Sequence, residues 1–112
     1  MQVTHEERGT VTVASITGSL DATTSPQLTE FFTRQLADGR INLVADLAGL
    51  DYTSSAGLRV LLNTTKQARQ RGGDVRLAAP VPNVKKVFEL SGFTSIMKFY
   101  PDVQSAVASY KK

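Results

Sequence analysis

The fold is decided by residues 50–58, which read Leu50-Asp51-Tyr52-Thr53-Ser54-Ser55-Ala56-Gly57-Leu58. An apolar, strand-like run over residues 41–47 leads into this stretch, and a helical pattern over about residues 56–71 leads out of it. Thr and Ser just before an apolar periodic run are typical helix N-caps, because their oxygens accept hydrogen bonds from free backbone N–H groups. The small residues after the hydroxyls let a partner approach the backbone closely. The stretch therefore predicts a corner between a strand and a helix, and it is a candidate site.

Length and composition are those of one small domain, which we expect to span residues 1–112. A chain of this size buries about two thirds of its unfolded surface, which is enough for one core without covalent cross-links. The sequence contains no Cys, which excludes disulfides, thiol catalysis and thiolate metal sites.

Charge and hydropathy argue against membrane and nucleic-acid partners. Residues 1–7 lack the basic region and apolar stretch of a signal peptide, and no apolar run approaches the roughly 18 residues that span a bilayer. The net charge of +3 comes from basic residues that are scattered, not gathered in a stripe with aromatic residues. We therefore expect a cytoplasmic protein that binds neither a membrane nor nucleic acid.

The N-terminal third of the chain predicts a β-hairpin followed by a helix. Residues 2–6 predict a short edge strand, residues 7–9 a turn, and the β-branched run 10–17 a second strand. Gly18-Ser19-Leu20-Asp21 then interrupts the strand pattern. A helix starts at Thr24-Ser25-Pro26, where Pro fits the first turn, and ends at Gly39, a natural left-handed cap. Its core-facing positions are Leu28, Phe31, Phe32, Gln35 and Leu36.

The rest of the chain alternates strands and helices. The run 41–47 is more continuous than alternating, which is typical of a central strand buried on both faces. A strand over 74–79, a short helix over 84–91, a brief strand near 97–99 and a final helix from Pro101-Asp102 follow. Strands joined through helices are normally parallel. We therefore expect an α/β fold: a small mixed sheet with a parallel centre, an antiparallel N-terminal edge strand and about four helices. The core face of the helix after the corner carries Leu58, Leu61, Leu62, Thr65 and Ala68.

The sequence does not support several kinds of catalytic or cofactor site. A Ser hydrolase built on Ser55 needs Gly two residues earlier, but that residue is Thr53, and the only histidine, His5, lies far upstream as an expected surface residue. Asp46 suggests a phosphoacceptor of the receiver-domain type, but the acidic pair and the Lys of such domains are missing. The glycine spacing gives no phosphate-binding loop, and no His and Cys cluster offers a metal site. We predict no cofactor, no metal and no enzyme activity.

Three strings in the sequence carry a family resemblance. Residues 18–21 read Gly18-Ser19-Leu20-Asp21, residues 47–62 read Leu47-Ala48-Gly49-Leu50-Asp51-Tyr52-Thr53-Ser54-Ser55-Ala56-Gly57-Leu58-Arg59-Val60-Leu61-Leu62, and residues 84–93 read Val84-Lys85-Lys86-Val87-Phe88-Glu89-Leu90-Ser91-Gly92-Phe93. In this order, the three strings resemble the Gly-x-Leu-Asp element, the signature string and the penultimate helix of the STAS domain. This domain defines the family of bacterial anti-sigma-factor antagonists. The resemblance covers nearly the whole chain in the correct order, and it implies the STAS fold.

The resemblance implies a partner-switching protein. In this family the unmodified form binds an anti-sigma factor that is also a serine kinase, and so frees a sigma factor. The kinase phosphorylates a Ser or Thr at the N-terminus of the second helix, the complex dissociates, and a phosphatase restores the active form. Alignment on Gly57-Leu58 places the acceptor at Ser55. The family commonly has Asp before the acceptor, whereas this chain has Ser54, which is the second candidate.

The resemblance also implies the surroundings of the acceptor. Asp21 matches the family's loop aspartate beside the phosphorylation site, and Thr53 and Gly57 complete that environment. Partner contacts are expected around the corner and on the exposed side of the helix, with a core position as the alternative for Leu58. The expected contacts are Tyr52, Leu58, Arg59 and Asn63.

Two other functions stay open on the sequence alone. A STAS-like structural subunit of a transport or sensory complex would use Ser55 only to cap the helix. A sensor of small ligands or nucleotides would bind an anion at the same corner.

Overall fold

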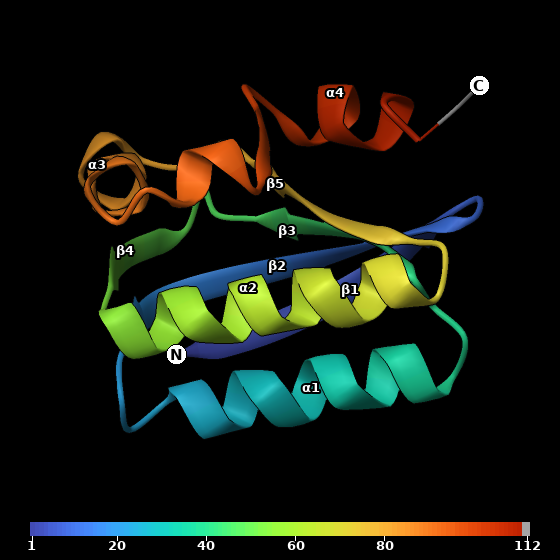
Figure 1. Ribbon diagram of the computed structural model, residues 1–112, viewed down its shortest axis with the longest axis horizontal. Coiled ribbons are helices and arrows are strands. Elements are labelled where there is room, and N and C mark those ends of the chain that lie inside the picture. Colours follow the sequence, from blue (N-terminus) through green and yellow to red (C-terminus); the bar gives the residue numbers. More distant parts are fainter. Residues whose placement is uncertain (111–112) are drawn as a thin grey trace.

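The computed structural model describes residues 1–110, which form a six-stranded mixed sheet with flanking helices (Figure 1). The strand order is β1-β2-β3-β5-β6, and β4 pairs with β2 outside this path. The β1–β2 pair is antiparallel and the other described pairs are parallel, which confirms the predicted fold class. The elements are β1 (Gln2–Arg8), β2 (Val11–Leu20), α1 (Ser25–Ala37), β3 (Asn42–Asp46), β4 (Leu50–Thr53), α2 (Ser55–Gln70), β5 (Asp74–Ala78), α3 (Pro82–Leu90), the 3-10 helix η1 (Phe93–Ser95), β6 (Lys98–Tyr100) and α4 (Val103–Ala108).

β2 is longer than its sequence pattern predicts. It runs to Leu20 because its last residues have a second partner, β4, with Gly18 opposite Leu50 and Leu20 opposite Thr53. The register shifts between Gly18 and Ser19, and Gly18 has a φ of 92°, which glycine adopts without a Cβ clash. The predicted interruption of the strand at Gly18-Ser19-Leu20 is therefore wrong, and the local pattern does not predict β4.

The helices divide between the two faces of the sheet. α1 and α2 lie side by side on one face, and α4 lies on the other (Figure 1). Two core clusters correspond to these faces. Alternate residues of β3 contribute Leu43 and Ala45 to the larger cluster and Val44 to the smaller one. β3 is thus buried on both faces, which confirms the prediction from its continuous apolar run.

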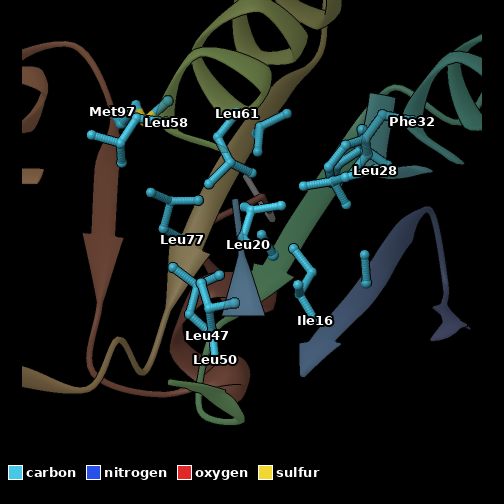
Figure 2. Packing of buried hydrophobic residues seen from close by; sticks show 14 of the residues in the cluster. Ile16, Leu20, Leu28, Phe32, Leu47, Leu50, Leu58, Leu61, Leu77 and Met97 are labelled. Atoms are coloured by element: carbon cyan, nitrogen blue, oxygen red, sulfur yellow. The ribbon is translucent and has the colours of Figure 1, made fainter. Parts of the chain in front are cut away.

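The larger cluster connects the corner to the centre of the fold (Figure 2). Leu20 from the end of β2, Leu50 from β4 and Leu61 from α2 are all 0 % exposed. Complete burial of a Leu side chain stabilises a fold by about 1.5–3 kcal/mol relative to exposure, so these residues hold the corner firmly from its inner side. Of the helix core positions expected from the sequence, Phe31 and Leu62 are only half-buried, and the buried ones are Leu28, Phe32, Gln35, Leu36, Leu58, Leu61, Thr65 and Ala68.

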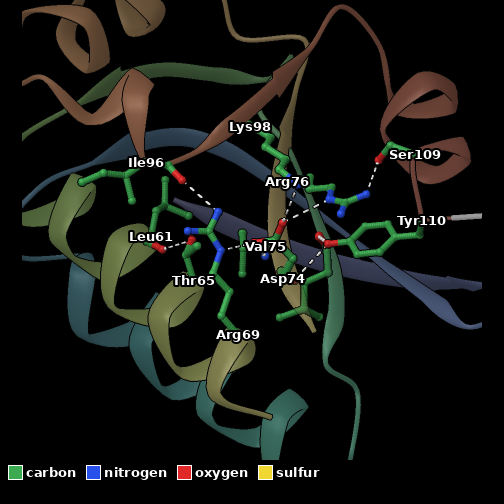
Figure 3. A network of polar contacts seen from close by, with 11 residues as sticks. Leu61, Thr65, Arg69, Asp74, Val75, Arg76, Ile96, Lys98, Ser109 and Tyr110 are labelled. Carbon is green, nitrogen blue, oxygen red and sulfur yellow. Dashed lines mark hydrogen bonds and ion pairs between the residues drawn. The ribbon is translucent and has the colours of Figure 1, made fainter. Parts of the chain in front are cut away.

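A buried carboxylate ties α2 and the C-terminal segment to β5 (Figure 3). Asp74, which is 5 % exposed, accepts hydrogen bonds from Arg69 Nε at 2.9 Å and from Arg76 Nε at 3.1 Å. Arg76 also donates to Ser109 Oγ at 2.7 Å and lies over the ring of Tyr110, 4.0 Å from its centroid. The single proton of the Tyr110 hydroxyl is shared between the backbone carbonyls of Leu43 at 2.6 Å and Asp74 at 2.9 Å. Burial, reinforced by the charge of Asp74, raises the pKa of Tyr110, so its hydroxyl stays a donor.

Candidate functional site

The candidate site is the corner where β4 ends and α2 begins. Thr53 is the last residue of β4, Ser54 is the N-cap of α2, and Ser55 is the first helical residue. The backbone N–H of Ser54 donates to the carbonyl oxygen of Leu20 at 2.8 Å. Thr53 is 1 % exposed, and its hydroxyl donates to the carbonyl oxygen of Ser54. The backbone bond thus fixes the corner against the end of β2, and the Thr53 side-chain bond lies within the corner itself.

The two candidate serines differ in what their hydroxyl groups do. Ser54 Oγ accepts a hydrogen bond from the N–H of Gly57 at 3.4 Å, so this side chain caps α2. Ser55 is exposed, and within residues 1–110 its hydroxyl has no hydrogen-bond partner. The N–H groups of Ser55 and Ala56 have no backbone acceptor in the same range. The free hydroxyl therefore lies beside free donors at the positive end of the helix dipole.

Gly57 allows α2 to approach β2 and β4 closely. A Cβ atom at this position would lie 2.5 Å from Leu20 Cγ and 2.6 Å from Thr53 Oγ1. These two neighbours are 0 % and 1 % exposed, so neither side chain can move aside into solvent. Close packing therefore requires glycine here, and Thr53 and Gly57 form the buried side of the corner.

Asp21 follows Leu20 directly, and its carboxylate is engaged in its own loop. Its Oδ1 accepts from the N–H groups of Thr23 at 2.9 Å and Thr24 at 3.0 Å, and Thr24 Oγ1 accepts from the Asp21 N–H at 2.9 Å. The bond from the Thr24 N–H is the main cause that holds the pKa of Asp21 below its ordinary value, with the Thr23 N–H adding to it. The ionised carboxylate therefore organises the start of α1.

The expected contact residues divide between the surface and the core. Tyr52 is 50 % exposed on β4, and Arg59 and Asn63 are exposed on α2, where they line a groove of about 140 Å³ between α1 and α2. Leu58 is 1 % exposed and belongs to the larger core cluster. Of the two roles left open for Leu58 by the sequence, the structure shows the core position.

One contact at the corner has no signal in the local sequence. Asn83, near the start of α3, donates through Nδ2 to the carbonyl oxygen of Asp51 at 2.7 Å. The two residues are 32 positions apart, so only the tertiary structure brings them together. Asn83 thus links α3 to β4 three residues before the capping serine.

Other features of the described residues lie away from the corner. A hollow of about 480 Å³ between β1 and α1 is lined by His5, Phe31 and Arg40 among others, and by none of the corner residues. Residues 1–110 hold no group of three or more His, Asp or Glu side chains placed to bind a metal ion. In the same range no helix has the length and apolar character needed to cross a bilayer.

Comparisons with known proteins agree on one family. The model of the STAS domain matches residues 2–106. Over 111 residues the chain is 37 % identical to the "Putative anti-sigma factor antagonist BtrV" of Bordetella bronchiseptica, which covers 99 % of this chain and 96 % of that protein. That name describes a regulator and not an enzyme.

Solved structures show the same fold. The crystal structure of an anti-sigma factor antagonist from Mycobacterium paratuberculosis superposes with a TM-score of 0.91 at 25 % identity, covering 99 % of this chain and 94 % of that one. A "putative anti-sigma factor antagonist" from Thermotoga maritima gives a TM-score of 0.93 over 98 % of this chain and 95 % of that one. At 19 % identity, this second likeness concerns the fold alone.

Proposed function

Because this chain belongs to the STAS domain family, we propose that it is an anti-sigma-factor antagonist that works by partner switching. The unmodified chain binds an anti-sigma factor that has serine kinase activity, and thereby releases a sigma factor in the cytoplasm. Phosphorylation of Ser55 by that kinase ends the binding, and a phosphatase removes the phosphate. The chain itself catalyses no step.

The observation that carries the choice of Ser55 is the difference between the two neighbouring hydroxyls. Ser54 Oγ is occupied as the cap of α2, whereas Ser55 is exposed and its hydroxyl has no partner within residues 1–110. A kinase can therefore reach Ser55 without breaking a bond of the fold. The free N–H groups of the first turn and the helix dipole stabilise a phosphate at that position, so the modified chain stays folded.

The phosphate acts on binding through its charge and its hydration. It adds about −1.5 to −2 charges at neutral pH, and a tight interface would have to strip water from them. A loss of about 3 kcal/mol of binding free energy weakens a complex by roughly a hundredfold or more. Tyr52 lies on β4 before the acceptor, and Arg59 and Asn63 lie four and eight residues after it on α2. All three are exposed, and they are the proposed partner contacts.

The proposal is tested by mapping phosphate and measuring binding with three variants. Incubation with the cognate anti-sigma factor and ATP, followed by peptide mass spectrometry, should place phosphate on Ser55 in the wild type and in Ser54→Ala, and give none in Ser55→Ala. By calorimetry, Ser55→Ala should bind the anti-sigma factor like the wild type, and Ser55→Asp should bind at least tenfold more weakly.

Ser54→Ala is the matched control, because it removes the neighbouring hydroxyl and costs only the cap, about 1 kcal/mol of stability. Phosphate found on Ser54 would move the switch by one residue. Equal affinity of Ser55→Ala and Ser55→Asp for the anti-sigma factor would remove Ser55 from the mechanism.

A further inference from the structure

One exposed face of α2 begins at the proposed acceptor and carries positive charge only. Ser55, Arg59, Asn63, Lys66 and Gln70 follow one another at spacings of three and four residues, and all are exposed. The sixteen residues of α2 include no Asp or Glu. A negative charge placed on Ser55 would therefore meet a cation as its first charged neighbour along the helix.

Arg59 differs from most of the other arginines near α1 and α2 in having no fixed partner. Arg34 pairs with Glu30 at 2.7 Å, Arg69 pairs with Asp74 at 2.9 Å, and Arg71 donates to a backbone carbonyl at 2.6 Å. Arg59 forms no ion pair or side-chain hydrogen bond with any other residue in the range 1–110. Its guanidinium is thus available to an anion that arrives at the corner.

The spacing of Ser55 and Arg59 suits an ion pair. Residues four apart on a helix have Cβ atoms about 5–6 Å from each other, and helical side chains lean toward the N-terminus. This geometry lets the Arg59 side chain reach the turn that holds Ser55. An anion four residues before a cation is also the better order, because it agrees with the helix dipole. Guanidinium binds phosphate through two parallel N–H···O bonds, which strengthens the pair.

We propose that Arg59 binds the phosphate on Ser55 and is thereby withdrawn from the surface that the unmodified chain offers to its partner. This inference rests on the proposed function. In the unmodified chain Arg59 lines the groove between α1 and α2 beside Thr33 and Gln67. Once paired with the phosphate, its charge is neutralised and its side chain is held over the first turn of α2. Phosphorylation then changes the interface twice, by adding an anion and by removing a cation.

A test without the partner uses protein in which phosphoserine is installed at position 55 during translation. ³¹P NMR titration gives the second pKa of the phosphate in the wild type, Arg59→Gln, Arg59→Lys and Lys66→Gln. Loss of the pair should raise this pKa by about 0.2–0.4 in Arg59→Gln, the scale of an exposed pair four residues apart. Arg59→Lys should retain part of the effect. Lys66→Gln removes the same charge from the same face two turns further on, and should leave the pKa within about 0.1 of the wild-type value.

The results separate this inference from the proposed function. A phosphate pKa that is equal in the wild type and Arg59→Gln, or that rises equally in Lys66→Gln, overturns the role of Arg59. In that case the switch itself still stands if the phosphorylated wild type has lost its anti-sigma factor. If the phosphorylated wild type keeps the anti-sigma factor, the proposed function is wrong whatever the titration gives.

Binding adds a second readout. Arg59→Gln should weaken the unmodified complex, and phosphorylation should then weaken it by a smaller factor than in the wild type, because the cation has already been removed. Equal factors in the two proteins would contradict the proposal.

Discussion

Replacing Gly57 by Ala tests the packing on which the corner depends. The added methyl group would lie 2.5 Å from Leu20 Cγ, 2.7 Å from Leu20 Cδ2 and 2.6 Å from Thr53 Oγ1. Carbon atoms in contact prefer a separation of about 3.5–4.0 Å, so the neighbours must move by roughly 1 Å. Both neighbours are buried, and Thr53 also holds the carbonyl of Ser54.

Two effects of opposite sign decide the stability of Gly57→Ala. Ala favours a helix over Gly by about 0.5–1 kcal/mol, whereas inserting a methyl group into a packed core costs about 1–3 kcal/mol. We expect overpacking to dominate, with a net loss of about 1–2 kcal/mol. For a chain of 112 residues, a loss of 1 kcal/mol in the free energy of unfolding lowers Tm by about 4 °C. The expected decrease in Tm for Gly57→Ala is therefore about 4–8 °C.

Urea unfolding followed by circular dichroism measures this change, and a second substitution tests its cause. Leu20→Ala alone should cost about 2–5 kcal/mol through the cavity that it leaves. In the presence of Gly57→Ala it should cost less, because the new methyl group occupies part of that space. The reasoning is refuted if Gly57→Ala is more stable than the wild type, or if the two substitutions are strictly additive.

Two other predictions concern the carboxylates of Asp74 and Asp21. Asp74→Asn should destabilise the fold by about 3 kcal/mol, because it leaves Arg69 and Arg76 without their shared anion. Asp38→Asn removes the carboxylate of an exposed ion pair and should cost less than about 0.5 kcal/mol. Equal urea midpoints for the two variants would contradict the assigned role of Asp74. The Thr24 N–H lowers the pKa of Asp21 in the folded protein below its ordinary value of 3.8. The charge of Asp21 therefore stabilises the fold above about pH 4, and this contribution is lost as the pH falls through the pKa of the folded protein. The wild type should therefore lose more stability than Asp21→Asn between pH 5 and about pH 2.5 in urea titrations at each pH, and parallel losses would show that Asp21 has no part in the acid sensitivity.

The predictable part of the fold is the part with a local signal. The start of α1 follows from Ser25 and Pro26, and its end from Gly39, which has a φ of 83°. The sequence predicts the helix after the corner from about residue 56, and α2 begins at Ser55. The spacing of Ser54 and Gly57 is that of an N-cap, and the cap bond is formed.

The unpredicted part depends on contacts between distant segments. β4 has four residues, too few for a periodic signal, and it is a strand because the end of β2 pairs with it. The same pairing carries β2 through Gly18, where the local residues favour a break. Asp74 begins a strand like any polar residue, and its burial is supported by cations from α2, β5 and β6. Sequence patterns of period two or 3.6 contain none of these partners.

The corner has a rigid inner side and a free outer side, and this predicts how Ser55→Asp affects folding. On the inner side Leu20, Thr53 and Gly57 are packed without room to shift. On the outer side Ser55 is exposed at the start of α2, where a negative charge is stabilised by about 0.3–1 kcal/mol through the helix dipole. Ser55→Asp should therefore unfold in urea at the wild-type midpoint or slightly above it, although it weakens partner binding. Ser55→Lys is the matched control, because it places the opposite charge at the same exposed position and should lower the midpoint. If Ser55→Asp were instead less stable than the wild type by more than about 1 kcal/mol, its loss of binding would follow from a damaged fold, and the switch would not be a surface event.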